Sequence, residues 1–201
     1  MKVDNYMLRI NKSNTEKSLI DACKKGQSKE QHELYERFSP KMMGVCMRYI
    51  HDHAEAEHVM IGGMVKVFEK LHQFNEEGSF EGWIRRIMVN ESLMYIRKNK
   101  AMSLEVDIDA AGSEPDFQAL ENQLEANDLL TLIAELPIGY RTVFNLFAIE
   151  GYNHKEIAEL LDINENTSKS QLSRARKYLQ TRLSEIQKAE LKKDKNNGST
   201  Q

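Results

Sequence analysis

Cysteine and long apolar runs are scarce in this chain of 201 residues. Its two cysteines, Cys23 and Cys46, are far apart and form no CxxC pair, so we expect buried thiols rather than a disulfide framework or a zinc site. No apolar run approaches the ~20 residues of a membrane span. The polar N-terminus also lacks the apolar core of a signal peptide. These absences predict a cytoplasmic protein.

Signatures of catalysis and of cofactor binding are also missing. The sequence contains no glycine-rich phosphate loop and no motif typical of a Ser/His/Asp triad. His51, His53 and His58 lie close in sequence, but His51 and His53 would point in different directions on a helix. No carboxylate or thiolate ligand set joins them, so surface histidines are expected. We therefore expect no catalytic residue, no metal and no cofactor.

Acidic charge is concentrated in one segment. The chain has a formal net charge of −3, and residues 101–128 contain eight Asp/Glu and no Lys or Arg. Residues 1–100 contain 17 Lys/Arg against 14 Asp/Glu, and residues 129–201 contain 11 against nine. Two mildly basic blocks are thus separated by an acidic one. Local basic surfaces, rather than the total charge, decide whether a protein binds the phosphates of a nucleic acid.

Helical periodicity dominates both basic blocks, and no strand-like alternation of useful length is present. In the first block Pro40 is predicted to start a helix, Asn75–Ser79 to form a loop, and Ser79 to cap the helix that comes after it. The helices expected in this block cover residues 19–25, 27–38, 40–51, 54–71 and 79–98.

The acidic segment has no sustained helical period, and so long a connection is unusual inside one compact domain. We therefore predict an all-α fold of two small helical domains joined by a flexible acidic linker, the C-terminal domain being a helix-turn-helix. The tail is rich in Lys, Asn, Gly and Ser and is expected to be disordered. The predicted boundaries are a first domain at 16–100, a linker at 101–122, a second domain at 123–187 and a tail at 188–201.

The second block has the features of a helix-turn-helix. After helices at 124–136 and 140–150, which end at Pro137 and Gly151, two more are expected at 155–161 and from Asn164 to about Ile186. Asp162 can adopt the left-handed conformation that the turn needs. Asn164 is a good N-cap. The inward positions of the last helix are Leu172, Ala175 and Leu179.

Polar and cationic residues form another stripe on that last helix. Short polar and cationic side chains near a helix N-terminus suit base edges in the major groove, and cations further along suit phosphates. An ordinary solvated basic face is the alternative, but the caps, the turn and the stripe agree on DNA binding. The candidate residues for duplex DNA are Lys169, Ser170, Ser173, Arg174, Arg176 and Lys177.

These residues resemble region four of the extracytoplasmic-function (ECF) sigma factors, which are two-domain initiation subunits of bacterial RNA polymerase. The matching stretches are Leu136-Pro137, Tyr140-Arg141, Val143-Phe144, Glu150–Tyr152, His154–Ala158 and Thr167–Arg176. The first block resembles region two of the same family. Its matching residues are Phe68, Leu71, Phe74, Gly78, Phe80, Trp83, Ile84, Arg85, Arg86, Ile87, Asn90 and Tyr95.

The resemblance implies a role for each domain and no enzymatic activity. Region two would dock on the clamp of the largest polymerase subunit and hold a flipped base of the melted minus-ten element. Region four would read the minus-thirty-five element as duplex and sit on the polymerase flap. Trp83, Ile84 and Ile87 share an apolar stripe and are expected in the core. The candidate minus-ten residues are Asn90, Arg85, Arg86, Gly78, Ser79 and Phe80.

One stretch departs from the family pattern. The positions of the polar polymerase-docking residues are occupied here by His58, Ile61 and Gly62, the candidate polymerase-binding residues. Gly62-Gly63 also weakens a helix, by about 1 kcal/mol per glycine relative to alanine. Either docking is rebuilt through apolar contacts, or polymerase binding is weakened and a recruiting partner is needed. Met60, Ile61 and Met64 are expected to be exposed and would suit such a partner.

The expected partners are core RNA polymerase, promoter DNA as duplex and as melted strand, and an anti-sigma factor or a recruiting protein. Two alternative functions stay open at this stage. One is a stand-alone helix-turn-helix regulator, which would bind duplex DNA by itself, often as a dimer. The other is an interaction protein that keeps the sigma fold without initiating transcription.

Overall fold

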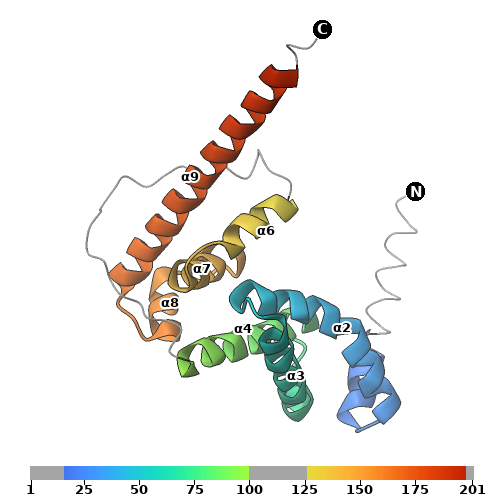
Figure 1. Ribbon diagram of the computed structural model, residues 1–201. Coiled ribbons are helices and arrows are strands. Elements are labelled where there is room, and N and C mark those ends of the chain that lie inside the picture. The colour runs from blue at the N-terminus through green and yellow to red at the C-terminus, as the bar shows by residue number, and fades with distance from the viewer. Residues whose placement is uncertain (1–15, 100–125, 198–201) are drawn as a thin grey trace, which may run out of the picture. The chain divides into compact units, whose positions relative to one another are not determined.

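A computed structural model describes residues 16–99 and 126–197, and the helices divide between two compact units, residues 1–98 and 99–201 (Figure 1). The described residues contain helices and no strand, which confirms the predicted all-α fold. The predicted acidic linker lies outside the described residues. No helix of the described part is long and apolar enough to cross a membrane.

The N-terminal unit is a small bundle. A helix over residues 16–24 leads into α2 (Ser28–Tyr49), α3 (His53–Lys70), the short 3₁₀ turn η1 (Leu71–Gln73) and α4 (Phe80–Lys98). The Asp52 carboxylate caps α3 by accepting a hydrogen bond from the Glu55 backbone N–H at 2.9 Å. The fully buried side chains include Leu34, Met42, Tyr49, Met64, Phe80, Ile84, Met88 and Ile96.

The prediction of a helix boundary at Pro40 was wrong. Pro40 lies inside α2, which continues through it without a break. Phe38 and Met42, on either side of the proline, are 2% and 1% exposed. Burial of this apolar face offsets the hydrogen bond that a proline removes from a helix interior.

The C-terminal unit contains α6 (Ala126–Ala134), α7 (Ile138–Phe144), a π-helical turn η2 (Asn145–Ile149), α8 (His154–Leu161) and α9 (Glu165–Asn197). Its core is formed by apolar residues from all of these elements. Those that are buried include Leu132, Leu136, Val143, Phe144, Leu146, Ile157, Leu172, Ala175, Leu179 and Leu183. The inward positions predicted for the last helix are thus confirmed.

Two features of this unit were not predicted. The π-helical turn η2 continues α7, and its wider winding is seen in the 2.9 Å hydrogen bond from the Glu150 N–H to the Asn145 carbonyl. The last helix extends to Asn197 rather than ending near Ile186, so most of the tail predicted to be disordered is helical. Ala, Glu, Leu and Lys in that stretch all have high helix propensity.

Candidate nucleic-acid interface

The helix-turn-helix formed by α8 and α9 is built from local capping interactions. The Asn153 side chain accepts a hydrogen bond from the Glu156 N–H at 3.0 Å, and the Glu156 carboxylate accepts one from the Asn153 N–H at 2.8 Å. This reciprocal capping box fixes the start of α8. Asp162 ends α8 with a φ of 55°, and Asn164 accepts a hydrogen bond from the Asn166 N–H at 2.8 Å. The predicted turn conformation of Asp162 and capping role of Asn164 are confirmed.

The candidate residues for duplex DNA lie along the first four turns of α9. Lys169 and Lys177 are exposed, and Ser170, Ser173, Arg174 and Arg176 are half-buried. Lys169 Nζ lies 2.7 Å from Glu165 Oε1, and this contact lowers the pKa of the Glu165 carboxyl. The Ser170 hydroxyl donates to the Thr167 carbonyl at 3.0 Å, which leaves its oxygen able to accept. Arg174 follows Ser173 directly and is the half-buried cation closest in sequence to Ser170 and Ser173.

Arg176 packs within the unit. Its guanidinium carbon lies 5.7 Å from the centroid of the Phe147 ring, and that ring stacks on His154 with 4.7 Å between centroids. Nδ1 of His154 is 2.9 Å from Oγ of Ser168, which is fully buried. The aromatic and polar contacts therefore join η2, the start of α8 and the start of α9. Phe147, His154 and Ser168 were not predicted as support for the reading helix, because these contacts cross between elements and have no single helical period.

In the N-terminal unit, α4 carries three of the candidate residues for the minus-ten element, Arg85, Arg86 and Asn90. Asn90 and Arg86 are exposed and one turn apart, and Arg85 is half-buried. The Ser79 hydroxyl accepts a hydrogen bond from the Gly82 N–H at 3.0 Å, which confirms its predicted role as the cap of α4. Ile84 is fully buried, as expected, whereas Trp83 and Ile87 are half-buried.

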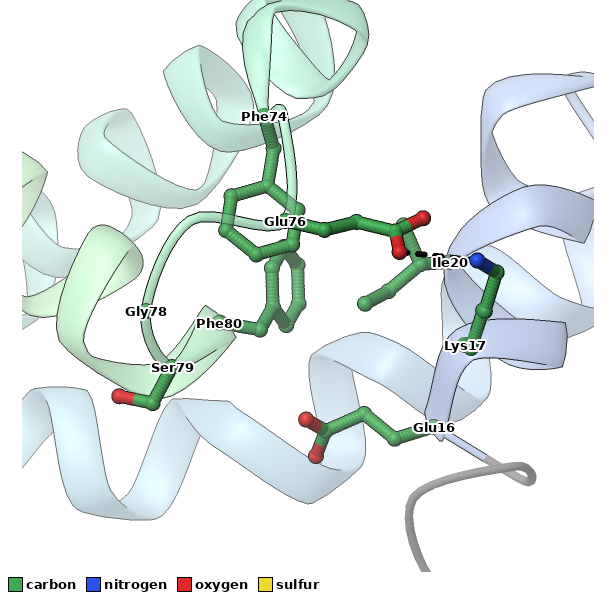
Figure 2. Close-up of a pocket in the computed structure, with 8 residues that line it drawn as sticks. All are labelled: Glu16, Lys17, Ile20, Phe74, Glu76, Gly78, Ser79 and Phe80. Atoms are coloured by element: carbon green, nitrogen blue, oxygen red, sulfur yellow. Dashed lines mark hydrogen bonds and ion pairs between the residues drawn. The ribbon is translucent and has the colours of Figure 1, made fainter.

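The loop before α4, residues 74–79, borders a cavity of about 190 Å³ (Figure 2). Gly78 has a φ of 82°, a conformation that suits glycine, and Glu76 adopts a φ of 65°. Gly78 and Ser79 line the cavity together with Glu16, Lys17 and Ile20 of the first helix. Gly78 and Ser79 are exposed, so the structure places both where a ligand in the cavity could reach them.

The ring of Phe80 cannot serve as an open stacking platform. Phe80 is 2% exposed, and its ring centroid lies 5.4 Å from that of Phe38, 5.1 Å from that of Phe74 and 5.8 Å from that of Trp83. Its ring belongs to the aromatic core beneath the loop and also lines the cavity, so a contact of Phe80 with minus-ten DNA stays a prediction, confined to a base inside the cavity. An apolar ring at the end of a loop gains more by burial than by exposure to water.

The candidate polymerase-binding residues share one surface of α3. His58, Ile61 and Gly62 are all exposed, and Ile61 retains 46% of its accessible area. Val65, one turn beyond Ile61, is 52% exposed and was not predicted as part of this surface. Met60 and Met64 were wrongly expected on it. They are 5% and 1% exposed and belong to the core.

The two adjacent glycines of α3 have different surroundings. A Cβ built on Gly63 would lie 2.5 Å from Met88 Sδ of α4, whereas a Cβ on Gly62 would meet nothing within 4 Å. Gly63 therefore permits the close packing of α3 against α4. Gly62 lies on the exposed side of the helix and has no packing reason to lack a side chain.

Both units match models of known protein families. The family model for sigma-70 region 2 matches residues 34–102, and that for sigma-70 region 4 matches residues 126–179. Together these models cover more than half of the chain. Both units thus have the sequence pattern of bacterial transcription initiation factors.

Several curated relatives are similar over nearly their whole length. The ECF RNA polymerase sigma-E factor of Haemophilus influenzae is 24% identical over 181 residues, which are 84% of this chain and 95% of the relative. The ECF RNA polymerase sigma factor SigW of Bacillus subtilis is 26% identical over 184 residues, with coverages of 85% and 97%. The chain belongs to the ECF sigma factors, which recognise promoters in association with RNA polymerase.

Two solved structures are also similar. CnrH, in complex with the cytosolic domain of CnrY, is 19% identical with a TM-score of 0.45 and coverages of 83% and 95%. The sigma factor RpoE of Bartonella quintana, in complex with the anti-sigma factor NepR, is 22% identical with a TM-score of 0.45 and coverages of 76% and 96%.

Proposed function

We propose that this sigma factor is a non-catalytic subunit that recruits core RNA polymerase to promoters and contacts each promoter at two places. The proposal rests chiefly on the helix-turn-helix, whose capped turn directs a stripe of polar and cationic residues on α9 toward solvent. Lys169, Ser170, Ser173 and Arg174 read base edges of the minus-thirty-five duplex, and Lys177 contacts phosphate. Half-buried Arg176 is a further proposed phosphate contact, and it also supports the helix through its contact with the Phe147 ring.

The N-terminal unit acts on the melted minus-ten element. Asn90 carries both a donor and an acceptor, and it lies on the exposed face of α4 with Arg86 one turn away. Arg85 and Arg86 contact phosphates of the single strand. The cavity under the loop, with Gly78 and Ser79 at its rim, receives a base that has left the stack.

Polymerase docking uses the exposed surface of α3. Ile61 and Val65, beside His58 and Gly62, offer an apolar contact in place of a polar one to the clamp of the largest subunit, while the C-terminal unit contacts the flap. Such docking is weaker or differently tuned, so a recruiting protein is a proposed additional partner. An anti-sigma protein, which would hold the chain away from polymerase, is another.

Transcription in vitro with core polymerase tests the whole proposal. Promoters identified by sequencing the DNA bound in cells would serve as templates. Specific transcripts that require this chain would support it. Duplex binding without transcription would instead favour a stand-alone regulator, and the absence of both would favour an interaction protein.

The test of docking is separate. Core polymerase would be titrated with the purified chain, and the affinity would be compared with that in an extract of native cells. Weak binding that the extract strengthens would support a recruiting partner. Tight binding by the purified chain would remove the need for one.

A further inference from the structure

The first described helix, residues 16–24, is anchored to the N-terminal unit and forms one wall of the cavity beside the loop at residues 74–79 (Figure 2). Leu19, Ile20 and Cys23 are 6%, 5% and 3% exposed. Three apolar side chains at helical spacing therefore hold this helix against the unit. The position of the cavity wall is fixed by the core.

Two lysines of this helix hold the loop. Lys17 Nζ donates to Glu76 Oε2 at 2.8 Å, as Figure 2 shows, and Lys24 Nζ donates to the carbonyl of Phe74 at 3.1 Å. Lys17 and Lys24 are seven residues apart, so they lie on the same face of the helix. Ile20 lies between them along that face and lines the cavity.

Glu76 is in a conformation that needs support. Its φ of 65° is in the left-handed region, which is unfavourable for a residue with a Cβ. Strained residues persist where the surrounding structure holds them, and they cluster at functional sites. Lys17 lowers the pKa of the Glu76 carboxyl through a hydrogen bond, and Glu76 raises the pKa of Lys17. The pair therefore stays charged across the neutral range.

We propose that the helix at residues 16–24 is part of the base-binding site, and that Lys17 is a positioning residue that holds Glu76, and with it the loop, in the shape that keeps the cavity open. This inference rests on the proposed role of the loop in holding a melted base. Lys17 acts through Glu76 and need not touch DNA. The N-terminal helix then contributes to promoter opening although it lies about fifty residues before the loop in sequence.

Promoter opening by the holoenzyme tests the proposal. The variants are Lys17→Ala, Lys17→Glu, Glu76→Ala and the exchanged pair Lys17→Glu/Glu76→Lys. Lys41→Ala is the matched control, because Lys41 forms a 2.6 Å ion pair with Glu81 at a similar exposure, outside the cavity. Opening would be measured by the permanganate reactivity of unpaired thymines, and duplex affinity by titration of a minus-thirty-five fragment.

Each single variant is expected to reduce opening by about two- to fivefold at low salt, the effect of losing an exposed ion pair. The exchanged pair should recover most of the loss, and Lys41→Ala should open promoters like the parent. Duplex affinity should not change. The difference between Lys17→Ala and the parent should shrink as salt is added, because the pair is half exposed.

Equal opening by Lys17→Ala and the parent at low salt would overturn the proposal. So would an exchanged pair that opens no better than Lys17→Glu alone, because the contact between the two charges would then be irrelevant. These results differ from failure of the proposed function, in which the parent holoenzyme itself would open no promoter. Thermal unfolding of each variant would show whether a loss of opening is only a loss of folding.

Discussion

The guanidinium of Arg176 lies over the ring of Phe147, with 5.7 Å between its central carbon and the ring centroid. That ring also stacks on the imidazole of His154, which contacts the buried Ser168. Arg176 thereby connects α9 to the start of α8. The two arginines of the stripe, Arg174 and Arg176, should therefore behave differently when they are replaced.

Arg176→Ala is expected to lower the free energy of unfolding by about 0.5–1 kcal/mol, the size of a partly exposed cation–π contact. Arg174→Ala is expected to leave unfolding within about 0.5 kcal/mol of the parent. It should instead weaken binding to the cognate duplex and lower the discrimination between bases at one position, by about 1–3 kcal/mol. Urea denaturation and duplex titration measure the two effects. Duplex affinity and selectivity that Arg174→Ala leaves unchanged would remove Arg174 from the proposed reading surface.

Replacement by alanine should affect the stability of the N-terminal unit differently at the two neighbouring glycines of α3. Gly62→Ala is expected to stabilise the N-terminal unit by up to about 1 kcal/mol, since alanine favours the helix and the new methyl group meets open space. Gly63→Ala should cancel that gain or destabilise, because its Cβ would collide with Met88, which is fully buried. Urea unfolding of both variants measures the difference. Equal stabilisation would show that Met88 can move aside at no cost.

The apolar surface of α3 should matter for docking and not for folding. Ile61→Ser and Val65→Ser are expected to change the free energy of unfolding by no more than about 0.5 kcal/mol, because both side chains are about half exposed. Each should weaken binding to core polymerase, measured by fluorescence titration. Leu130→Ser, which alters an exposed leucine of the other unit, is a matched control. Polymerase affinity equal to the parent's in both variants would contradict docking through this surface.

Alkaline pH should destabilise the N-terminal unit through Cys23. Burial raises the pKa of this thiol from the ordinary 9.0 to about 11, so the folded chain keeps the proton that the unfolded chain gives up. The stabilising contribution is complete below pH 9 and is lost as the pH rises from about 9 to 11. Cys23→Ala should unfold with a shallower dependence on pH in that window. Parallel curves for the variant and the parent would assign the alkaline loss to other groups.

Local signals predicted the helix-turn-helix well. Asp162, Asn164 and Gly151 each act through a preference of their own backbone or side chain, and the structure places each in the predicted role. A contact between residues three or four apart can be predicted from the sequence, because capping and turn geometry depend only on a few neighbouring residues. The same applies to Ser79 at the start of α4.

Predictions that depended on packing fared less well. Pro40 is a strong local signal for a boundary, yet the burial of Phe38 and Met42 carries α2 through it. Met60 and Met64 were expected outside, but both are buried, and the largely buried ring of Phe80 borders the cavity rather than the open surface. The sequence alone does not show whether an apolar side chain belongs to a binding surface or to the core. Only the crossing of α3 and α4, and the aromatic cluster beneath the loop, decide which side faces inward.

The π-helical turn η2 gives the support of the reading helix a tolerance to a change in length. Such a turn absorbs one extra residue within a single turn of an α-helix, so the helix before it keeps the face that it turns toward the core. Loss of one residue from η2 would return the segment to ordinary winding without rotating α7 about its axis. The buried face of α7, with Val143 and Phe144, would then still point into the core. A shorter η2 would therefore change which side chains fill the turn, among them Phe147 beneath Arg176, rather than the direction in which α7 faces.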